Sequence, residues 1–89
     1  MIAERLVLDD QAFVDLVVWQ LDRPSAGCSH RFRYRLAYVV RGDCVVRYDN
    51  EAGKGDRRHV GKRERACEFT SLDALQADFW ADVARWKER

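Results

Sequence analysis

One stretch, HRFRYRLAYVV at residues 30–40, constrains the fold more than any other part of this 89-residue chain. Alternate positions belong to two chemical sets. The apolar set is Phe32, Tyr34, Leu36, Tyr38 and Val40, and the cationic set is Arg31, Arg33 and Arg35. A β-strand places alternate side chains on opposite faces of its sheet. The stretch therefore predicts a strand with one buried face and one arginine-rich face.

Further strands are predicted on both sides of this one. ERLVLDD (residues 4–10) and AFVDLVVWQLD (12–22) have apolar residues at both parities, but their β-branched and aromatic content favours strands over helices. RPSAGCS (23–29) is typical of a loop. Arg41, Gly42 and Asp43 predict a turn, with Gly42 available for a positive φ, and CVVRYD (44–49) is then the hairpin partner. ERACEF (64–69) predicts one more short strand.

The last segment, TSLDALQADFWADVARWKER at residues 70–89, predicts a helix. Ser71 or Thr70 can cap its N-terminus, and Asp73 suits the first turn. An apolar stripe recurs at three- and four-residue spacing, formed by Leu72, Leu75, Phe79, Val83 and Trp86. The expected fold is one α+β domain over residues 1–89, an antiparallel sheet of about five strands with this helix packed on one face. The expected core is Phe32, Tyr34, Leu36, Tyr38, Val46, Phe69, Leu75, Phe79 and Val83.

Charge is segregated along the chain, although the net charge is only +1. Residues 31–65 hold 11 Lys or Arg against 5 Asp or Glu, whereas both flanking regions are acidic. A basic middle region indicates an anionic partner for that region. No apolar run is long enough to span a bilayer. MIAERLVLDD has charge by residue 4 and no apolar core, so we expect no secretory signal. The three cysteines, Cys28, Cys44 and Cys67, form no disulfide pattern, so we expect a protein of the reducing cytoplasm.

The stretch YDNEAGKGDRRHVGKRER, residues 48–65, is predicted to be one long connection between strands. Connections in compact domains usually have about 4–6 residues, and structureless ones beyond about 12–15 are uncommon and tend to be functional. Gly53, Gly55 and Gly61 would let its backbone fold closely around a ligand. We therefore expect this connection to be the working surface of the protein.

The connection carries groups suited to RNA cleavage by a 2′-hydroxyl, a reaction that needs a base, an acid and cations on the phosphate. A histidine can serve as either acid or base near neutral pH, which points to His59. The expected catalytic residues are His59, Tyr48, Asp49 and Asp56. The expected phosphate-binding residues are Lys54, Arg57 and Arg58 in the connection, and Arg31, Arg33, Arg35 and Arg47 on the sheet.

Other site chemistries lack support in the sequence. The phosphate-binding pattern Gly-x-x-x-x-Gly-Lys-Ser/Thr is absent. Cys28 and His30 are close in sequence, but a zinc site would need two further ligands from a distance. We expect neither a metal nor a cofactor. Nor is a serine or cysteine nucleophile paired with a base.

YDNEAGKGDRRHVG, taken with HRFRYRLAYVV and CEFTSLDALQADFWADV, resembles the TumE-type toxins over about residues 30–83. The most specific positions are Tyr48 to Asn50, Gly53 to Asp56, and Arg58 with His59. The resemblance implies a toxin of a type II toxin–antitoxin pair, with a helix-turn-helix antitoxin as partner. It also implies action on RNA or translation in the manner of RelE-like interferases, with or without the ribosome. Where members of the family often have a histidine, this chain has Arg57, which removes one possible acid or base.

Two other functions fit the same residues. The protein could be a nucleic-acid-binding module that grips phosphates and cuts nothing, or a basic domain that docks on an acidic protein. A simpler interpretation of the arginine face is a solvated surface neutralised by Glu64, Glu68 or Asp15 from neighbouring strands. The oligomeric state is not predicted by the sequence.

Overall fold

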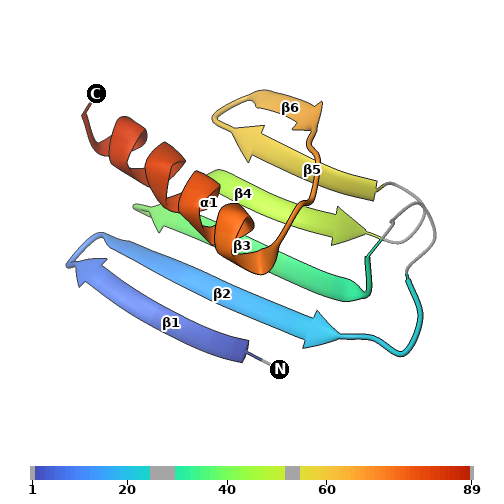
Figure 1. Ribbon diagram of the computed structural model, residues 1–89. Coiled ribbons are helices and arrows are strands. Elements are labelled where there is room, and N and C mark those ends of the chain that lie inside the picture. Colours follow the sequence, from blue (N-terminus) through green and yellow to red (C-terminus); the bar gives the residue numbers. More distant parts are fainter. Residues whose placement is uncertain (1, 25–29, 52–54, 89) are drawn as a thin grey trace.

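The structure is a computed structural model that describes residues 2–24, 30–51 and 55–88. Within these ranges it has six strands and one helix: β1 (Ile2–Asp9), β2 (Ala12–Gln20), β3 (Phe32–Val40), β4 (Asp43–Glu51), β5 (Gly55–Val60), β6 (Arg63–Ala66) and α1 (Leu72–Lys87). The strands form one sheet in the order β1-β2-β3-β4-β5-β6, and each strand is antiparallel to its neighbour (Figure 1). The predicted α+β class is confirmed, with six strands where about five were expected.

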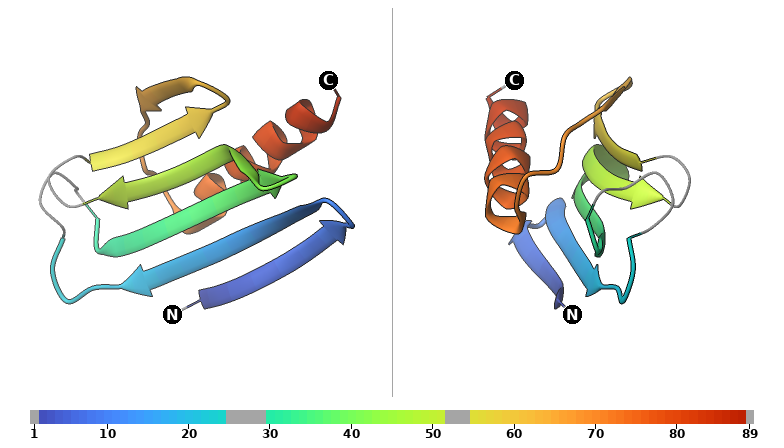
Figure 2. Two further views of the ribbon diagram at one scale, coloured as in Figure 1. Left: turned by 180° about the vertical axis from the view of Figure 1, so that it is seen from behind. Right: turned by 45° about the vertical axis from the view of Figure 1, so that its right-hand side comes forward.

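The helix covers one face of the sheet and leaves the other face open. In the left view of Figure 2 the sheet lies in front of α1, and the right view shows α1 standing to one side of the strands. We call the face that carries α1 the helix face and the opposite face the outer face. This division of the sheet into two faces decides where every functional side chain lies.

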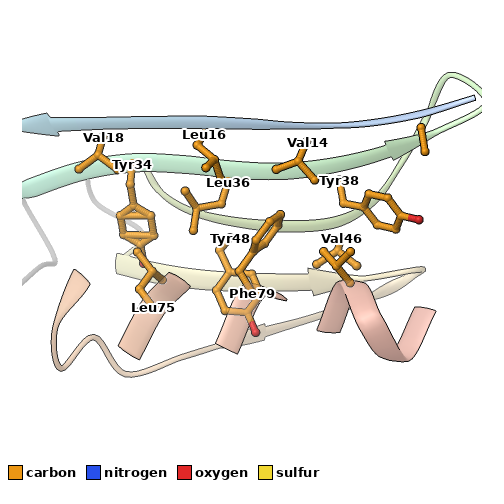
Figure 3. Close-up of a cluster of buried hydrophobic side chains, with 12 residues drawn as sticks. Val14, Leu16, Val18, Tyr34, Leu36, Tyr38, Val46, Tyr48, Leu75 and Phe79 are labelled. Carbon is orange, nitrogen blue, oxygen red and sulfur yellow. The ribbon is translucent and has the colours of Figure 1, made fainter. Parts of the chain in front are cut away.

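The alternation in β3 divides its residues as predicted. Tyr34, Leu36 and Tyr38 are buried on the helix face, whereas Arg33 and Arg35 are exposed on the outer face. Figure 3 shows the aromatic and aliphatic side chains of β2, β3 and β4 meeting Leu75 and Phe79 of the helix. The expected core is confirmed, with Phe32 and Phe69 at its margin, where they are only partly buried.

The ends of α1 and the β3–β4 turn also follow the sequence signals. Ser71 Oγ accepts a hydrogen bond of 3.0 Å from Ala74 N, which satisfies one N–H group of the first helical turn. Arg41 and Gly42, with φ of 52° and 84°, form the two-residue turn between Val40 and Asp43. Positive φ at both positions is the requirement of a type I′ hairpin turn.

The prediction of one long connection over residues 48–65 is wrong. Tyr48 to Glu51 complete β4, and β5 and β6 form a further hairpin that turns at Gly61 and Lys62. The error has a physical cause, because both faces of β5 are polar. Asp56 and Arg58 lie on the helix face and Arg57 and His59 on the outer face, so apolar residues do not alternate with polar ones. The predicted strand over residues 64–69 is shorter and earlier than expected, since β6 ends at Ala66.

Candidate functional site

The residues predicted to form one site are divided between the two faces. Asp49, Arg57 and His59 lie on the outer face with Arg33, Arg35 and Arg47, whereas Tyr48, Asp56 and Arg58 lie on the helix face. Arg31, just before β3, is exposed. Lys54, Gly53 and Cys28 are outside the described residues. The alternation along β4 and β5 thus separates side chains that are neighbours in sequence.

On the outer face, His59 lies within a group of charged side chains from three strands. It is opposite Arg47 on β4 and opposite Glu64 on β6. Its Nε2 is 3.1 Å from a terminal guanidinium nitrogen of Arg47 and 4.0 Å from Asp49 Oδ1, and its Nδ1 is 3.8 Å from Glu64 Oε2. Because an arginine only donates, Nε2 is the acceptor and Nδ1 carries the proton in the neutral ring. The imidazole is 23% exposed and can be reached from solvent.

Arg47 and Arg57, the cations beside His59, each have a carboxylate partner. Arg47 Nε is 3.0 Å from Asp49 Oδ2, but its N–H is not aligned with that oxygen and makes no hydrogen bond within the described residues. Arg57 Nε donates to Glu64 Oε1 at 3.1 Å. Such partly exposed pairs are worth only about 0–1 kcal/mol, so an incoming anion can displace them at small cost.

Arg33 and Arg35 of β3, and Arg31 just before it, which we call the β3 arginines, differ from these two cations. Within the described ranges, Arg31, Arg33 and Arg35 make no ion pair with a carboxylate, although Arg35 is opposite Asp49. Of the acidic residues expected as partners, Asp15 is bound by Arg5 through two hydrogen bonds of 2.7 and 3.0 Å, and Glu64 by Arg57. Within the described residues, the outer face therefore presents the unpaired guanidinium groups of Arg33 and Arg35, with the exposed Arg31 just before the strand, on the same side of the sheet as His59.

The helix face holds a second polar group, centred on Asp82 of α1, which is 3% exposed. Arg58 donates to both of its carboxylate oxygens, at 2.8 and 2.6 Å, Arg85 donates at 2.9 Å, and the Tyr48 hydroxyl donates at 2.5 Å. Burial, together with this bond to the carboxylate, raises the pKa of Tyr48 above its ordinary value. The bond to Asp82 also raises the pKa of Arg58. Tyr48 therefore stays protonated near neutral pH and is committed to Asp82.

Asp56 belongs to a third polar group, which includes the second histidine of the chain. Asp56 Oδ1 accepts from the Tyr34 hydroxyl at 2.7 Å and from His30 Nε2 at 2.9 Å, while His30 Nδ1 accepts from Phe32 N at 3.1 Å. Both side chains of the His30–Asp56 pair are 9% exposed, and the imidazole stacks on Phe69 at 3.8 Å between ring centroids. Since both ring nitrogens are engaged, His30 cannot exchange a proton without losing a bond.

A second basic surface lies on the helix face at the edge of the sheet. An open cleft of about 420 Å³ is lined by Arg58, Lys62, Arg63 and Arg65, together with Val60 and Gly61. Lys62, Arg63 and Arg65 are exposed and make no ion pair within the described part of the chain. They are not among the residues predicted from the sequence to bind phosphate, and they provide charge-matched controls for the outer-face arginines.

No group of three or more metal-binding side chains occurs in the described residues. Nor is any helix in the same ranges long and apolar enough to cross a membrane. What the fold and the site define is a small α+β protein whose sheet is stabilised by a polar network on one face and carries an accessible cationic cluster on the other.

The sequence model of the family described as Toxin TumE matches residues 2–87. The chain belongs to this toxin family, which confirms the resemblance seen in the sequence and implies an antitoxin partner in general. No curated protein and no solved structure matches the chain.

Proposed function

We propose that this toxin binds and cleaves RNA on the outer face of its sheet, in the manner of a RelE-like interferase. One observation carries the proposal: a solvent-accessible histidine lies beside Arg47 and Arg57, on the same face as Arg33 and Arg35, which have no carboxylate partner among the described residues. Arginines attract phosphate and bind it through two parallel hydrogen bonds. A cationic face of this kind therefore suits a polyanion.

The outer face offers the groups for cleavage by the 2′-hydroxyl of RNA. A base removes the 2′ proton, the oxygen forms a bond to phosphorus, and the bond from phosphorus to the 5′ oxygen breaks as an acid protonates that oxygen. Asp49 and His59 are the proton-exchanging pair in this proposal, because the other two expected catalytic residues, Tyr48 and Asp56, are bonded on the helix face. The products are a 2′,3′-cyclic phosphate and a 5′-hydroxyl, and the reaction needs no metal.

Arg47 has two roles in this proposal. In the free protein its guanidinium donates a hydrogen bond of 3.1 Å to Nε2 of His59, so this nitrogen cannot accept a proton from a substrate. When a phosphate binds between Arg47 and Arg57, the guanidinium turns to the phosphate and frees Nε2 for proton transfer. Charge stabilisation of the phosphorane then comes from groups already present at the site.

We further propose that the antitoxin is a helix-turn-helix protein that covers the outer face in the cytoplasm. Acidic residues of the antitoxin would compensate Arg33 and Arg35 and exclude RNA at the same time. Replacing both arginines by glutamate should slow antitoxin association, because complementary charge mainly raises the association rate. An unchanged association rate would place the antitoxin elsewhere.

The test of the catalytic proposal is His59→Gln. We expect RNA cleavage, assayed with and without ribosomes, to fall by about 10²–10⁴-fold, the usual contribution of a general acid or base. RNA affinity and thermal stability should stay close to those of the parent. Lys62→Gln is the control, since it changes an exposed residue of the adjacent turn.

The alternatives give different results. A binding module without catalysis would show RNA affinity but no cleavage in the parent protein. A basic protein-interaction domain would show neither. A folded His59→Gln variant that cleaves RNA as fast as the parent would remove His59 from the mechanism.

A further inference from the structure

Among the described residues, Trp19 is one of the large hydrophobic side chains that are exposed, and it is not among those that pack against the core. It lies near the end of β2 and is 50% exposed on the outer face, opposite Arg33 of β3. Within the described residues its ring makes no aromatic contact and no guanidinium stacks on it. Trp80 and Trp86, in contrast, pack against the core from α1.

The surroundings of Trp19 are cationic. Arg33 is directly across the ladder, and Arg31 and Arg35 are two residues away on either side of it. Diagonal neighbours across an antiparallel pair are close enough for long side chains to interact. An exposed indole is thus bordered by the three arginines for which the described ranges show no carboxylate partner.

Phe13, the other aromatic residue on the outer face of β2, differs from Trp19 because its ring is covered by a neighbouring side chain. The guanidinium of Arg5 lies 4.2 Å above its centroid, and Asp15 holds that guanidinium with hydrogen bonds of 2.7 and 3.0 Å. Phe13 is therefore covered by a neutralised cation. An aromatic ring on the outer face of β2 can therefore be covered by a neighbouring guanidinium. The exposure of the Trp19 ring reflects its particular surroundings, because Phe13 on the same strand is covered.

We propose that Trp19 is a stacking platform for an unpaired base of single-stranded RNA, with Arg31, Arg33 and Arg35 holding the phosphates on either side. This inference rests on the proposed function and specifies its substrate. Aromatic side chains stack on bases without strong sequence preference, and cationic grooves follow the backbone. A base inside a duplex is already stacked and has no free face to offer.

Strand spacing separates this platform from the catalytic group. Trp19 and His59 lie three strands and about four residues apart in the register of β2 to β5. At about 4.8 Å between strands and about 3.3 Å per residue, the separation is roughly 20 Å. One nucleotide cannot reach both groups, so the base on Trp19 belongs to a different nucleotide from the phosphate at His59.

A second copy of this chain is a poorer occupant for the platform. Two outer faces brought together would combine two surfaces on which Arg33, Arg35, Arg47 and Arg57 outnumber Asp49 and Glu64. Like charges at the centre of an interface are unfavourable. RNA supplies both an aromatic ring for the indole and phosphates for the arginines.

The probe is a short RNA of adenine and cytosine, which cannot pair with itself, with methylated 2′-hydroxyls so that it is not cleaved. Trp19→Ala should weaken its binding by roughly 5- to 100-fold, which corresponds to about 1–3 kcal/mol for one stacked base. Trp19→Phe should recover most of the affinity, and Phe13→Leu should leave it unchanged. Because the indole is uncharged, Trp19→Ala should not alter the slope of affinity against salt concentration.

The outcomes separate this inference from the function on which it rests. If the parent binds no RNA, both fail. If the parent binds RNA and Trp19→Ala binds the single strand equally well, only the stacking platform is lost. Equal weakening for the single strand and for its duplex would also contradict stacking on an unpaired base. Loss of antitoxin affinity alone would identify Trp19 as part of a protein interface.

Discussion

The two faces of the β4–β5 hairpin carry similar chemical groups in opposite states. On the helix face, Asp82 accepts hydrogen bonds from Tyr48, Arg58 and Arg85 and is almost fully buried. On the outer face, His59 lies among partly exposed side chains at 3.1 to 4.0 Å, and in the described part of the chain Arg33 and Arg35 have no carboxylate partner. Alternate residues of the same strands therefore belong to two different groups. On the helix face the polar groups are hydrogen-bonded within the protein, which we call the saturated face, and on the outer face they remain accessible to a ligand, which we call the open face.

This difference distinguishes the charged residues that stabilise the fold from those that remain available to bind a ligand. A buried carboxylate with all its bonds made within the protein has nothing left for a ligand, and removing one partner leaves a costly unpaired charge. Cations at the surface contribute little to stability and retain their capacity to bind. The saturated face should therefore respond to mutation through folding, and the open face through activity.

The largest effect on folding is expected for Asp82→Ala. The substitution leaves Arg58 and Tyr48 without their buried acceptor. Breaking a buried ion pair costs about 3–5 kcal/mol, and we expect about 3 kcal/mol because the Arg58 side chain is 29% exposed and can regain water. Chemical denaturation measures the loss. Asp78→Ala, an exposed carboxylate one turn earlier on α1, is the control and should stay within about 0.5 kcal/mol of the parent.

A smaller effect, with a distinct pH dependence, is expected for Tyr48→Phe. Loss of the hydrogen bond to Asp82 should cost about 2 kcal/mol at neutral pH. The pKa of Tyr48 is raised above its ordinary value of 10.0 by burial and by the Asp82 carboxylate. Its contribution is therefore complete below about pH 10 and is lost as the pH rises through the folded-state pKa. The stability difference between parent and variant should narrow in that alkaline range. A difference that grows with alkaline pH would contradict the sign of this shift.

The smallest effect on folding is expected for Arg35→Ala on the outer face. Its free energy of unfolding should change by less than about 0.5 kcal/mol. The slope of log affinity for single-stranded RNA against log salt should fall by about 0.7, the value for one phosphate contact. Arg65→Ala removes another exposed arginine, from the helix face, and should leave the slope unchanged. Equal effects of the two variants would mean that RNA does not distinguish the faces.

Much of the fold was predictable because β3 and α1 have strong periodic patterns. Leu36 and Phe79, both fully buried, follow from period-two and helical spacing respectively. β5 was not predictable in the same way. Asp56 and Arg58 occupy its helix face, and only the tertiary partners Tyr34, His30 and Asp82 make polar residues acceptable there. A hydrophobic pattern cannot indicate a strand whose buried face is polar.

The candidate site was predictable in its composition but not in its arrangement. The sequence places Arg57, Arg58 and His59 side by side, and treating them as a flexible loop allowed all three to meet one phosphate. Once β5 is a strand, Arg58 points away from the other two. Trp19 was missed because apolar residues occur at both parities of its strand, so the sequence alone does not show which of them are exposed.

The position of α1 after all six described strands has a consequence for synthesis. Every outer-face residue of the proposed site precedes the helix, whereas Leu75, Phe79 and Val83 and the Asp82 carboxylate come from α1. A growing chain on the ribosome therefore contains all the outer-face arginines before it has the complete core that holds their strands in place. Products released before α1 is made would carry the outer-face arginines without the helix that completes the core. We therefore expect the outer-face site to form only after α1 has been synthesised.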